Sequence, residues 1–254
     1  MTANASMSVV TAWDNLWRHA PDFAKDDALL AREEQSPRWH TMLNVLTHEH
    51  RSLSRIHAIE LGSGRGDLSA LLARRGARVT LLDTSERALI QARRRFDRIG
   101  LDADFECRNM FDEIARRRAR FDLAISSGVI EHFAGADRTR ALRAHYETLR
   151  PGGVTIISVP HAWCIPYRLW KAYLEARGCW PYGREIPYSR HEILRRGRDA
   201  GFSDGQAVCL GFWHSISAHW GRSILGLDVD WAARSSPLDS MIGLILLYIA
   251  RRPV

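Results

Sequence analysis

Hydrophobic residues follow a helical period in the first 54 residues of the chain and a mixed period afterwards. In residues 1–54 they recur every three to four positions, which predicts helices that each bury one apolar face. The positions that carry this period are Trp13, Leu16, Trp17, Trp39, Met42, Leu43 and Leu46. We therefore expect residues 1–54 to form an N-terminal helical cap.

From residue 55 onward, short apolar runs alternate with amphipathic segments. The apolar runs predict strands at 56–61, 78–82, 103–107, 121–126, 154–159, 206–212 and 242–250. Helices are expected at 67–75, from Ser85 to about residue 99, and at 137–149, 163–177 and 190–200. Strands that alternate with helices at this spacing predict an α/β fold, with a parallel sheet covered on both faces.

The segment after the fifth expected strand is too long and too aromatic for a simple connector. Its large aromatic residues are Trp163, Tyr167, Trp170, Tyr173, Trp180, Tyr182 and Tyr188. The segment leaves the sheet at the carboxyl end of a strand, where ligands collect in open α/β folds. We therefore expect residues 160–190 to form a lid on one ligand-binding domain that spans residues 55–254. By their spacing, Trp163, Tyr167 and Trp170 are expected to share one helical face.

The composition is that of a globular protein with excess positive charge. Hydrophobic residues make up 46% and charged residues 26%, and the formal net charge is +7. Only Lys25 and Lys171 are lysines among the 36 basic residues, so the excess reflects a general use of arginine. The densest runs, Arg93–Arg95 and Arg116–Arg118, are typical of solvated helix faces, with a polyanion-binding surface as the alternative.

The cysteines and the apolar runs bear on the compartment. The cysteines are Cys107, Cys164, Cys179 and Cys209. They form neither a CxxC pair nor a Cys/His zinc pattern, so we expect free thiols, no metal and a reducing environment. The longest apolar run, 241–250, is far shorter than the ~20 residues of a membrane-spanning helix, and residues 1–11 do not resemble a leader peptide. These features predict a cytoplasmic protein without a membrane span.

The main chemical signal is a glycine-rich turn, GSGRG at residues 62–66, between the first strand and the helix after it. Glycines let the backbone approach a ligand closely, and the helix presents its amino-terminal amides there. Asp83 lies at the tip of the second strand, where a carboxylate can accept both hydroxyls of a ribose. Together these residues predict a cofactor that contains a nucleoside.

Two cofactor classes share this layout. A dinucleotide site uses GxGxxG, but Asp67 stands where the third glycine would be. Glu60, just before the loop, suits a ligand with cationic groups better than a pyrophosphate. The sequence therefore favours S-adenosylmethionine over a nicotinamide cofactor, and a glycine turn without any ligand is the remaining alternative.

Five segments resemble the class I S-adenosylmethionine-dependent methyltransferases, in particular the small-molecule type of ubiquinone biosynthesis. They are IELGSGRGDLS (59–69), VTLLDTSERAL (79–89), FECRNMFD (105–112), FDLAISSGVIEHF (121–133) and LRPGGVTIISVP (149–160). The resemblance implies a Rossmann-like sheet of seven strands, mostly parallel, with helices on both faces. It also implies that the last strand, expected at 242–250, is antiparallel.

The resemblance further implies which residues contact the cofactor. Around the methionine end it places Glu60, Gly62, Ser63, Gly64 and Gly66. Around the ribose and adenine it places Asp83, Thr84, Asn109 and Met110, with Asn109 at a position where the family often has aspartate. Along the sulfonium side it places Ser126, Ser127 and Ile130.

Methyl transfer is an in-line displacement at a carbon that the sulfonium already activates, so alignment in a dry pocket supplies much of the catalysis. A hydroxyl acceptor also benefits from a base, and His132 and His161 lie just beyond the fourth and fifth strands. A structural role is the alternative for each histidine. We expect an enzyme that methylates a small apolar or aromatic acceptor, with oxygen favoured over nitrogen or carbon.

Other functions stay open. Methylation of RNA or protein fits the basic charge, but residues 126–129 (SSGV) differ from the Asn/Asp-Pro-Pro-aromatic motif of amino-methylating DNA enzymes. A protein that binds S-adenosylmethionine without methylating fits the same loop. Glu185 would suit an amine acceptor, although a loop carboxylate is the simpler interpretation. We expect a small-molecule partner and no nucleic acid, and the sequence leaves the oligomeric state open.

Overall fold

The computed structural model describes residues 13, 17–18, 23–49, 52–113, 119–221 and 234–254. Leu16 and the run Arg116–Arg118 lie outside these residues. No helix within the described ranges has the length and apolar content that crossing a membrane requires.

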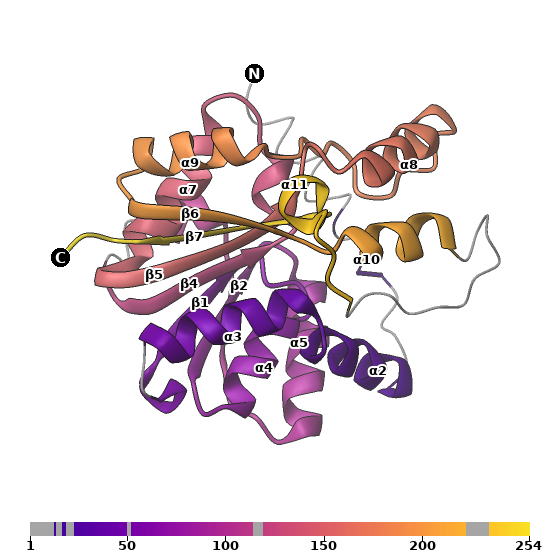
Figure 1. The fold of residues 1–254 in the computed structure, drawn as a ribbon. Helices are drawn as coiled ribbons and strands as arrows, with labels where there is room; N and C mark the ends of the chain where they lie inside the picture. The colour runs from indigo at the N-terminus through magenta and orange to yellow at the C-terminus, as the bar shows by residue number, and fades with distance from the viewer. Residues whose placement is uncertain (1–12, 14–16, 19–22, 50–51, 114–118, 222–233) are drawn as a thin grey trace.

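A seven-stranded sheet forms the centre of the fold (Figure 1). In chain order its strands are β1 (His57–Leu61), β2 (Arg78–Asp83), β3 (Asp104–Cys107), β4 (Phe121–Ser127), β5 (Leu149–Pro160), β6 (Ser203–Leu210) and β7 (Ile245–Arg251). Their spatial order is β3-β2-β1-β4-β5-β7-β6, and β7 runs antiparallel to both of its neighbours while the other pairs are parallel. The expected α/β class and the antiparallel last strand are confirmed.

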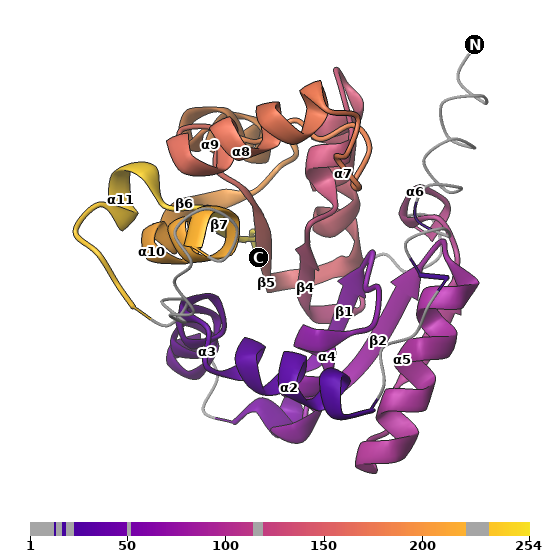
Figure 2. The same cartoon turned by 90° about the vertical axis from the view of Figure 1, so that its right-hand side faces the viewer.

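Helices cover both faces of the sheet (Figures 1 and 2). One face carries α2 (Phe23–Glu34), α3 (Pro37–Glu49), α4 (Asp67–Arg74) and α5 (Glu86–Ile99). The other face carries α7 (Asp137–Thr148) and α9 (Arg190–Asp199). Trp39, Met42 and Leu46 are buried in the same hydrophobic core as residues of the strands. The described N-terminal helices therefore pack directly on the sheet.

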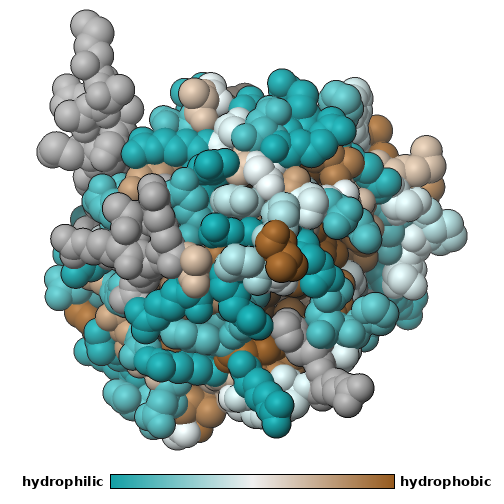
Figure 3. Space-filling model, turned by 90° about the vertical axis from the view of Figure 1, so that its left-hand side faces the viewer, coloured by the Kyte–Doolittle hydropathy of each residue, from teal (hydrophilic) through white to brown (hydrophobic). Residues whose placement is uncertain are grey.

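The remaining elements gather mainly where the parallel strands end. They are η1 (Leu53–Arg55), α6 (Met110–Glu113), η2 (Ile130–His132), α8 (Ile165–Ala176), α10 (Phe212–Ile216), the π-helical turn η3 (Ser217–Gly221) and α11 (Asp239–Ile242). Figure 1 shows α8 and α10 on the side where β5 and β6 end. The opposite edge, where β7 ends, is mainly hydrophilic with small, separate apolar groups (Figure 3). The elements that can enclose a ligand therefore lie at the carboxyl edge of the parallel strands.

Local sequence signals set the ends of α5. Ser85 begins the helix by accepting a 3.3 Å hydrogen bond from the Ala88 amide, as an N-cap residue does. Gly100 ends it in the left-handed region, with φ of 66°. The expected start of this helix at Ser85 is confirmed.

Two strands begin earlier than the hydrophobic pattern predicted. β5 begins at Leu149, which pairs with Phe121 before a register shift that accommodates Pro151 and the glycines after it. β6 begins at Ser203 and has its own irregularity, where Asp204 adopts φ of 52°. Bulges interrupt the two-residue alternation of side chains. The hydrophobic pattern therefore marks only the part of each strand after the bulge, and the predicted start comes too late.

Candidate functional site

The glycine loop lies between the carboxyl end of β1 and the amino end of α4. The amides of Gly62 and Ser63 both donate to one carbonyl of β2, over 2.8 and 3.0 Å. Gly62 and Gly66 have φ of 71° and 69°, and an added Cβ atom would lie 2.7 Å from Val129 and 2.3 Å from Leu81, respectively. Glycine is therefore required at both positions, by backbone conformation and by close packing.

Asp83, at the end of β2, holds this loop directly. Its Oδ2 accepts a 2.8 Å hydrogen bond from the Gly64 amide, and its Oδ1 accepts one of equal length from the Ser85 amide. A carboxylate offers about four acceptor positions in all, so hydrogen bonds from a ligand are compatible with these contacts. The loop and the acid, which are distant in the sequence, thus lie side by side.

Glu60 is buried between β1 and α4. Its Oε2 accepts hydrogen bonds from the amide and the hydroxyl of Ser69, at 3.1 and 2.5 Å. Burial raises the pKa of Glu60 to about 8, while the hydrogen bonds from Ser69 act in the opposite direction. The side chain therefore anchors the first turn of α4 beneath the loop.

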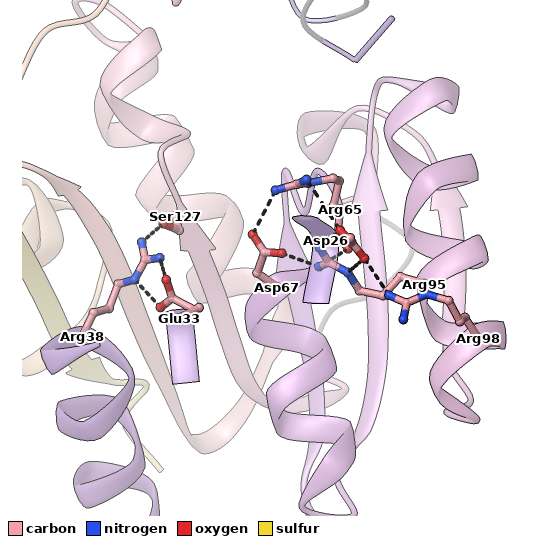
Figure 4. A network of polar contacts seen from close by, with 8 residues as sticks. All are labelled: Asp26, Glu33, Arg38, Arg65, Asp67, Arg95, Arg98 and Ser127. Carbon is pink, nitrogen blue, oxygen red and sulfur yellow. Dashed lines mark hydrogen bonds and ion pairs between the residues drawn. The ribbon is translucent and has the colours of Figure 1, made fainter. Parts of the chain in front are cut away.

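Arg38, which no sequence pattern marked, places its guanidinium between Glu33 and Ser127 (Figure 4). It projects from the first turn of α3 with 19% of its side chain exposed, and its Nη1 donates to the Ser127 hydroxyl at the end of β4. Burial disfavours its charge, yet the carboxylates of Glu33, Asp67 and Glu60 raise the pKa of Arg38 above its usual value. Arg38 is therefore a fixed positive charge at the carboxyl edge of the sheet.

The residues expected around the adenine lie at the ends of β2 and β3. Thr84 is exposed directly after Asp83, and Met110 is buried. Oδ1 of Asn109 accepts a 2.9 Å hydrogen bond from the amide two residues further on, at the start of α6. The Arg108 amide donates to the carbonyl of Asp83, over 2.9 Å, and so joins the two strand ends. The structure brings these expected residues to one edge.

Three residues were expected along the sulfonium side, and in the structure their side chains have different surroundings. Ser126 is 1% exposed, and its hydroxyl pairs with Nε2 of His145 in α7 at 2.9 Å. Ile130 is fully buried in the core, whereas Ser127 turns its hydroxyl toward Arg38. A side-chain contact with a ligand is therefore open to Ser127, while Ser126 and Ile130 can offer their backbone.

His132 lies in η2, directly beyond β4. Its Nδ1 is 2.7 Å from the carbonyl of Arg184, which can only accept, so Nδ1 carries the proton and Nε2 is the basic nitrogen of the neutral ring. Burial lowers the pKa of His132, while the carbonyls of Arg184 and Gly128 act in the opposite direction. The ring of Trp13 meets it edge-on, with ring centroids 4.9 Å apart. A neutral, partly enclosed imidazole therefore lies at the end of β4.

His161, the other expected base, is enclosed at the antiparallel side of the sheet. It is 2% exposed, and its Nδ1 lies 3.2 Å from the carbonyl of Gly243. Its Nε2 lies 3.9 Å from Sγ of Cys209 in β6, and burial lowers the pKa of His161. Both ring nitrogens thus face away from β1 and its glycine loop, a geometry that favours the structural alternative for His161.

Glu131 is a second residue that no sequence pattern marked. It is 2% exposed, and its Oε2 has no hydrogen-bond partner among the described residues. Burial raises the pKa of Glu131 to about 8, backbone amides partly offset this effect, and the nearby carboxylate of Glu185 adds to it. At neutral pH the protonated acid is therefore the favoured form of Glu131.

The segment expected to form a lid is attached to the same edge. The Ile186 amide donates to the carbonyl of Glu131 over 2.8 Å, which fixes the end of the segment on η2. α8 contacts the π-helical turn η3, where Nε1 of Trp220 donates to the carbonyl of Pro166 over 3.0 Å. The rings of Trp170 and Trp220 lie 5.6 Å apart. Residues 160–190 and η3 are therefore connected by polar and aromatic contacts.

One expectation about this segment is wrong. Trp163 precedes α8 and is 67% exposed, whereas Tyr167 lies within the helix and is 4% exposed. The two residues therefore do not share a helical face. The cause is Pro166 in the first turn of α8, because proline is tolerated there but not in the interior that a longer helix would need.

The ring of Trp17 packs against the glycine loop. An added Cβ atom on Gly64 would lie 2.9 Å from the Trp17 ring, and the guanidinium of Arg65 lies 5.9 Å from the centroid of that ring. The Gln91 side chain donates to the carbonyl of Trp17 over 2.8 Å. An indole ring is thus held against the loop by residues from α5 and from the loop itself.

A cavity of about 270 Å³ opens beside Arg38. Its wall includes Leu29, Arg38, Arg65, Leu210, His214 and Ile245. These residues come from the N-terminal helices, the glycine loop, the end of β6, α10 and the start of β7. The cavity therefore extends from the loop toward the antiparallel side of the sheet, with both charged and apolar walls.

Known proteins are similar to this chain in sequence. A family described as a methyltransferase domain matches residues 58–153, from β1 into β5. The ubiquinone biosynthesis O-methyltransferase of Cereibacter sphaeroides (strain ATCC 17029 / ATH 2.4.9) is 36% identical over 188 residues, which cover 71% of this chain and 73% of that protein. The protein of that name from Azoarcus sp. (strain BH72) is 30% identical over 164 residues. That match covers 60% of this chain and 66% of the Azoarcus protein, just under two thirds of its length.

Solved structures share the fold. The magnesium protoporphyrin IX methyltransferase of Synechocystis PCC 6803, with bound SAH, superimposes with a TM-score of 0.62 and 17% identity, and 99% of this chain and 98% of that chain are covered. A possible histamine N-methyltransferase of Thermotoga maritima gives a TM-score of 0.58 at 18% identity, with 85% of this chain and 96% of that chain covered. At these identities the likeness concerns the fold alone.

Proposed function

Since this chain belongs to the class I S-adenosylmethionine-dependent methyltransferases, we propose that it transfers a methyl group from that cofactor to a small acceptor molecule. The observation that carries the proposal is the hydrogen bond between Gly64 and Asp83. It joins the glycine loop to the acid suited to a ribose, at the edge of the sheet where ligands bind in this class of fold.

The residues at this edge fit the cofactor. The Ser63 hydroxyl oxygen is buried and has no hydrogen-bond partner among the described residues, so a polar ligand group would satisfy it. Gly62 and Gly66 have φ of 71° and 69°, which lets the loop backbone turn sharply at this edge of the sheet. Arg38 supplies the positive charge that the single carboxylate of the cofactor calls for.

These features support an assignment of each part of the cofactor. The methionine carboxylate is assigned to Arg38, and the rest of the methionine end to Glu60, Gly62, Ser63, Gly64 and Gly66. The ribose and adenine are assigned to Asp83, Thr84, Asn109 and Met110. The sulfonium side is assigned to Ser127, with Ser126 and Ile130 contributing backbone atoms.

When bound, the cofactor supplies a methyl group on a sulfonium, which is already activated for displacement. The chain then has to align the acceptor and exclude water. Trp17 shields the loop. Nε2 of His132 takes the proton from an acceptor hydroxyl, because the neutral ring holds its lone pair on that nitrogen. His161 is the alternative base, although its enclosure supports a structural role.

We further propose a small apolar or aromatic acceptor that is methylated on oxygen. The relatives that share 30% and 36% identity are named O-methyltransferases of ubiquinone biosynthesis. Residues 160–190, as a lid, would bring aromatic side chains to the acceptor, such as Tyr167 and Trp180, whose ring centroids lie 6.3 Å apart. Ligand pockets are mostly apolar, with a few polar groups that fix orientation.

Binding and transfer can be tested separately. Calorimetry with S-adenosylhomocysteine measures the cofactor site, and transfer of a labelled methyl group is then assayed on catechols and phenols, with aliphatic amines and bulk RNA as comparisons. We expect binding, and a methyl ether identified by mass spectrometry. Transfer only to RNA or amines would overturn the acceptor class. Binding without transfer to any probe would favour a non-methylating protein.

A further inference from the structure

Arg38 uses two different edges of its guanidinium. On one edge Nε donates over 2.9 Å to one carboxylate oxygen of Glu33, and Nη2 donates to the other oxygen (Figure 4). On the other edge Nη1 donates to the Ser127 hydroxyl and lies 3.5 Å from the hydroxyl of Ser158 on the next strand. The bidentate pair fixes the plane of the guanidinium, so its second edge faces the carboxyl ends of β4 and β5.

Glu33 is itself held in place at the turn between α2 and α3. The Ser36 hydroxyl donates to Oε1 of Glu33 over 3.1 Å and accepts from the Trp39 amide at 3.0 Å. Exposed ion pairs contribute little, because solvent screens them and both side chains lose freedom. Only 14% of the Glu33 side chain is exposed, and a neighbouring hydroxyl fixes it. The ion pair between Glu33 and Arg38 is therefore largely shielded from solvent and fixed in its geometry.

The other end of α2 is tied to the glycine loop by a second carboxylate (Figure 4). Asp26 and Glu33 lie about two helical turns apart, so both point to one face of α2. Asp26 accepts from Nε of Arg95 at 2.8 Å and from Nη2 of Arg98 at 3.1 Å. Arg95 also donates to the carbonyl of Arg65 in the loop over 3.1 Å. α2 is thus fixed relative to the loop, and it carries Glu33 at a fixed place.

We propose that Glu33 is a positioning residue that orients Arg38 toward the carboxylate of the bound cofactor. The inference rests on the proposed function, because it takes Arg38 as the partner of that carboxylate. A guanidinium already fixed on one edge loses little further freedom when an anion binds the other edge. Glu33 therefore increases the preference of the site for a cofactor that carries a carboxylate.

The test compares two ligands that differ only in this group, S-adenosylmethionine and its decarboxylated form, by calorimetry without an acceptor. We expect Glu33→Gln to weaken binding of S-adenosylmethionine by about five- to tenfold and to change that of the decarboxylated form less than about twofold. Glu34→Gln is the matched control. It removes the same charge at the next position, where Glu34 pairs with Arg74 and Arg75 at 3.3 and 3.5 Å.

A double-mutant cycle shows whether Glu33 acts through Arg38. In an Arg38→Ala background, Glu33→Gln is expected to have no further effect on S-adenosylmethionine affinity. Glu33→Asp, which keeps the charge, is expected to recover part of the loss. Thermal unfolding of each variant confirms that the protein tested is folded.

Three results would overturn the inference. Equal losses for both ligands would show that Glu33 supports the fold and not the carboxylate contact. Tighter binding of S-adenosylmethionine by Glu33→Gln would show that Glu33 competes with the cofactor for Arg38. A parent protein that binds neither ligand would overturn the proposed function, and this inference with it.

Discussion

The amide of Gly64 and the carboxylate of Asp83 form a 2.8 Å hydrogen bond that closes the glycine loop onto the tip of β2. Asp83 therefore shapes the loop as well as offering oxygens to a ribose. We expect Asp83→Ala to reduce affinity for S-adenosylhomocysteine by roughly 100-fold or more, because each hydrogen bond to a charged group contributes about 1.5–3 kcal/mol. Calorimetry measures this loss.

The control for Asp83 is Asp104→Ala, which removes an exposed carboxylate paired with Arg78 at 2.9 Å. That variant should bind S-adenosylhomocysteine as the parent does. Asp83→Ala should also unfold at a lower temperature than the control, because the amides of Gly64 and Ser85 lose their acceptor. Unchanged affinity in Asp83→Ala would refute the placement of the cofactor.

Gly66 should tolerate alanine poorly. Its φ is 69°, and an added Cβ atom would lie 2.3 Å from Leu81. The left-handed conformation costs roughly 1–2 kcal/mol and overpacking about 1–3 kcal/mol, so Gly66→Ala should lower the free energy of unfolding by about 2–5 kcal/mol. Gly135→Ala is the control, because Gly135 has φ of 57° but no atom within 4 Å of the added Cβ. Equal losses in urea denaturation would contradict the packing argument.

The two candidate bases can be separated by substitution. His132→Ala should lower kcat by ~10²-fold or more, with little change in S-adenosylhomocysteine affinity. His161→Ala should lower the unfolding temperature but leave kcat within a few-fold, because its ring contacts the β6 and β7 side of the sheet. The opposite pattern would assign the base to His161.

The pH profile gives an independent test of His132. Burial lowers its pKa below the usual value, so the neutral, basic form dominates at pH 7. The kcat of the parent should therefore be flat above pH 7 and fall only toward acidic pH. A rise in kcat between pH 7 and 8 would show that a group of higher pKa accepts the proton.

Glu131 should make the protein less stable as pH rises. Burial raises the pKa of Glu131 to about 8 in the folded state, whereas an unfolded glutamate titrates near 4.5. Its stabilising contribution is therefore complete below pH 4.5 and is lost as pH rises through about 8. Glu131→Gln stays neutral, so at pH 9 it should unfold roughly 5 °C or more above the parent, with a smaller difference at pH 5.

Thermal unfolding at pH 5, 7 and 9 measures this difference. Glu86→Gln is the control, because Glu86 is exposed in the first turn of α5. Its difference from the parent should show no comparable growth over this range. A constant difference for Glu131→Gln would contradict the raised pKa.

The sheet and the cofactor loop were predictable because their signals are local. Buried parallel strands appear as continuous apolar runs, and the residues that follow them meet at one edge whatever the connecting helices do. Gly62 follows β1, Asp83 ends β2 and Asn109 lies two residues beyond β3, so they could be assigned to one site from the sequence. These three residues lie close together because their strands are neighbours in the sheet.

Arg38 and Glu131 could not be found in this way. Arg38 reaches Ser127, far along the chain, only because α3 packs on the sheet with its first turn over the ends of β4 and β5. The one available signal was its place directly before Trp39 on a helix with a buried face. The unusual state of Glu131 comes mainly from burial in the folded chain, with the nearby carboxylate of Glu185 adding to it, and no local pattern reveals either effect. Pro166 carried a local signal for the start of α8 at Ile165, which the expected helix at 163–177 did not take into account.

The cavity beside Arg38 sets unequal limits on evolutionary change in the two ends of the chain. The N-terminal helices give it Leu29 and Arg38, and the same helices carry Glu33, so drift there alters the cavity wall and the cofactor contact together. On another part of the wall, Leu210 ends β6 and Ile245 begins β7, and both pack against the core of the sheet. The shape of the cavity can therefore change most freely through the connection between these two strands, which carries His214, while the N-terminal helices stay under double selection.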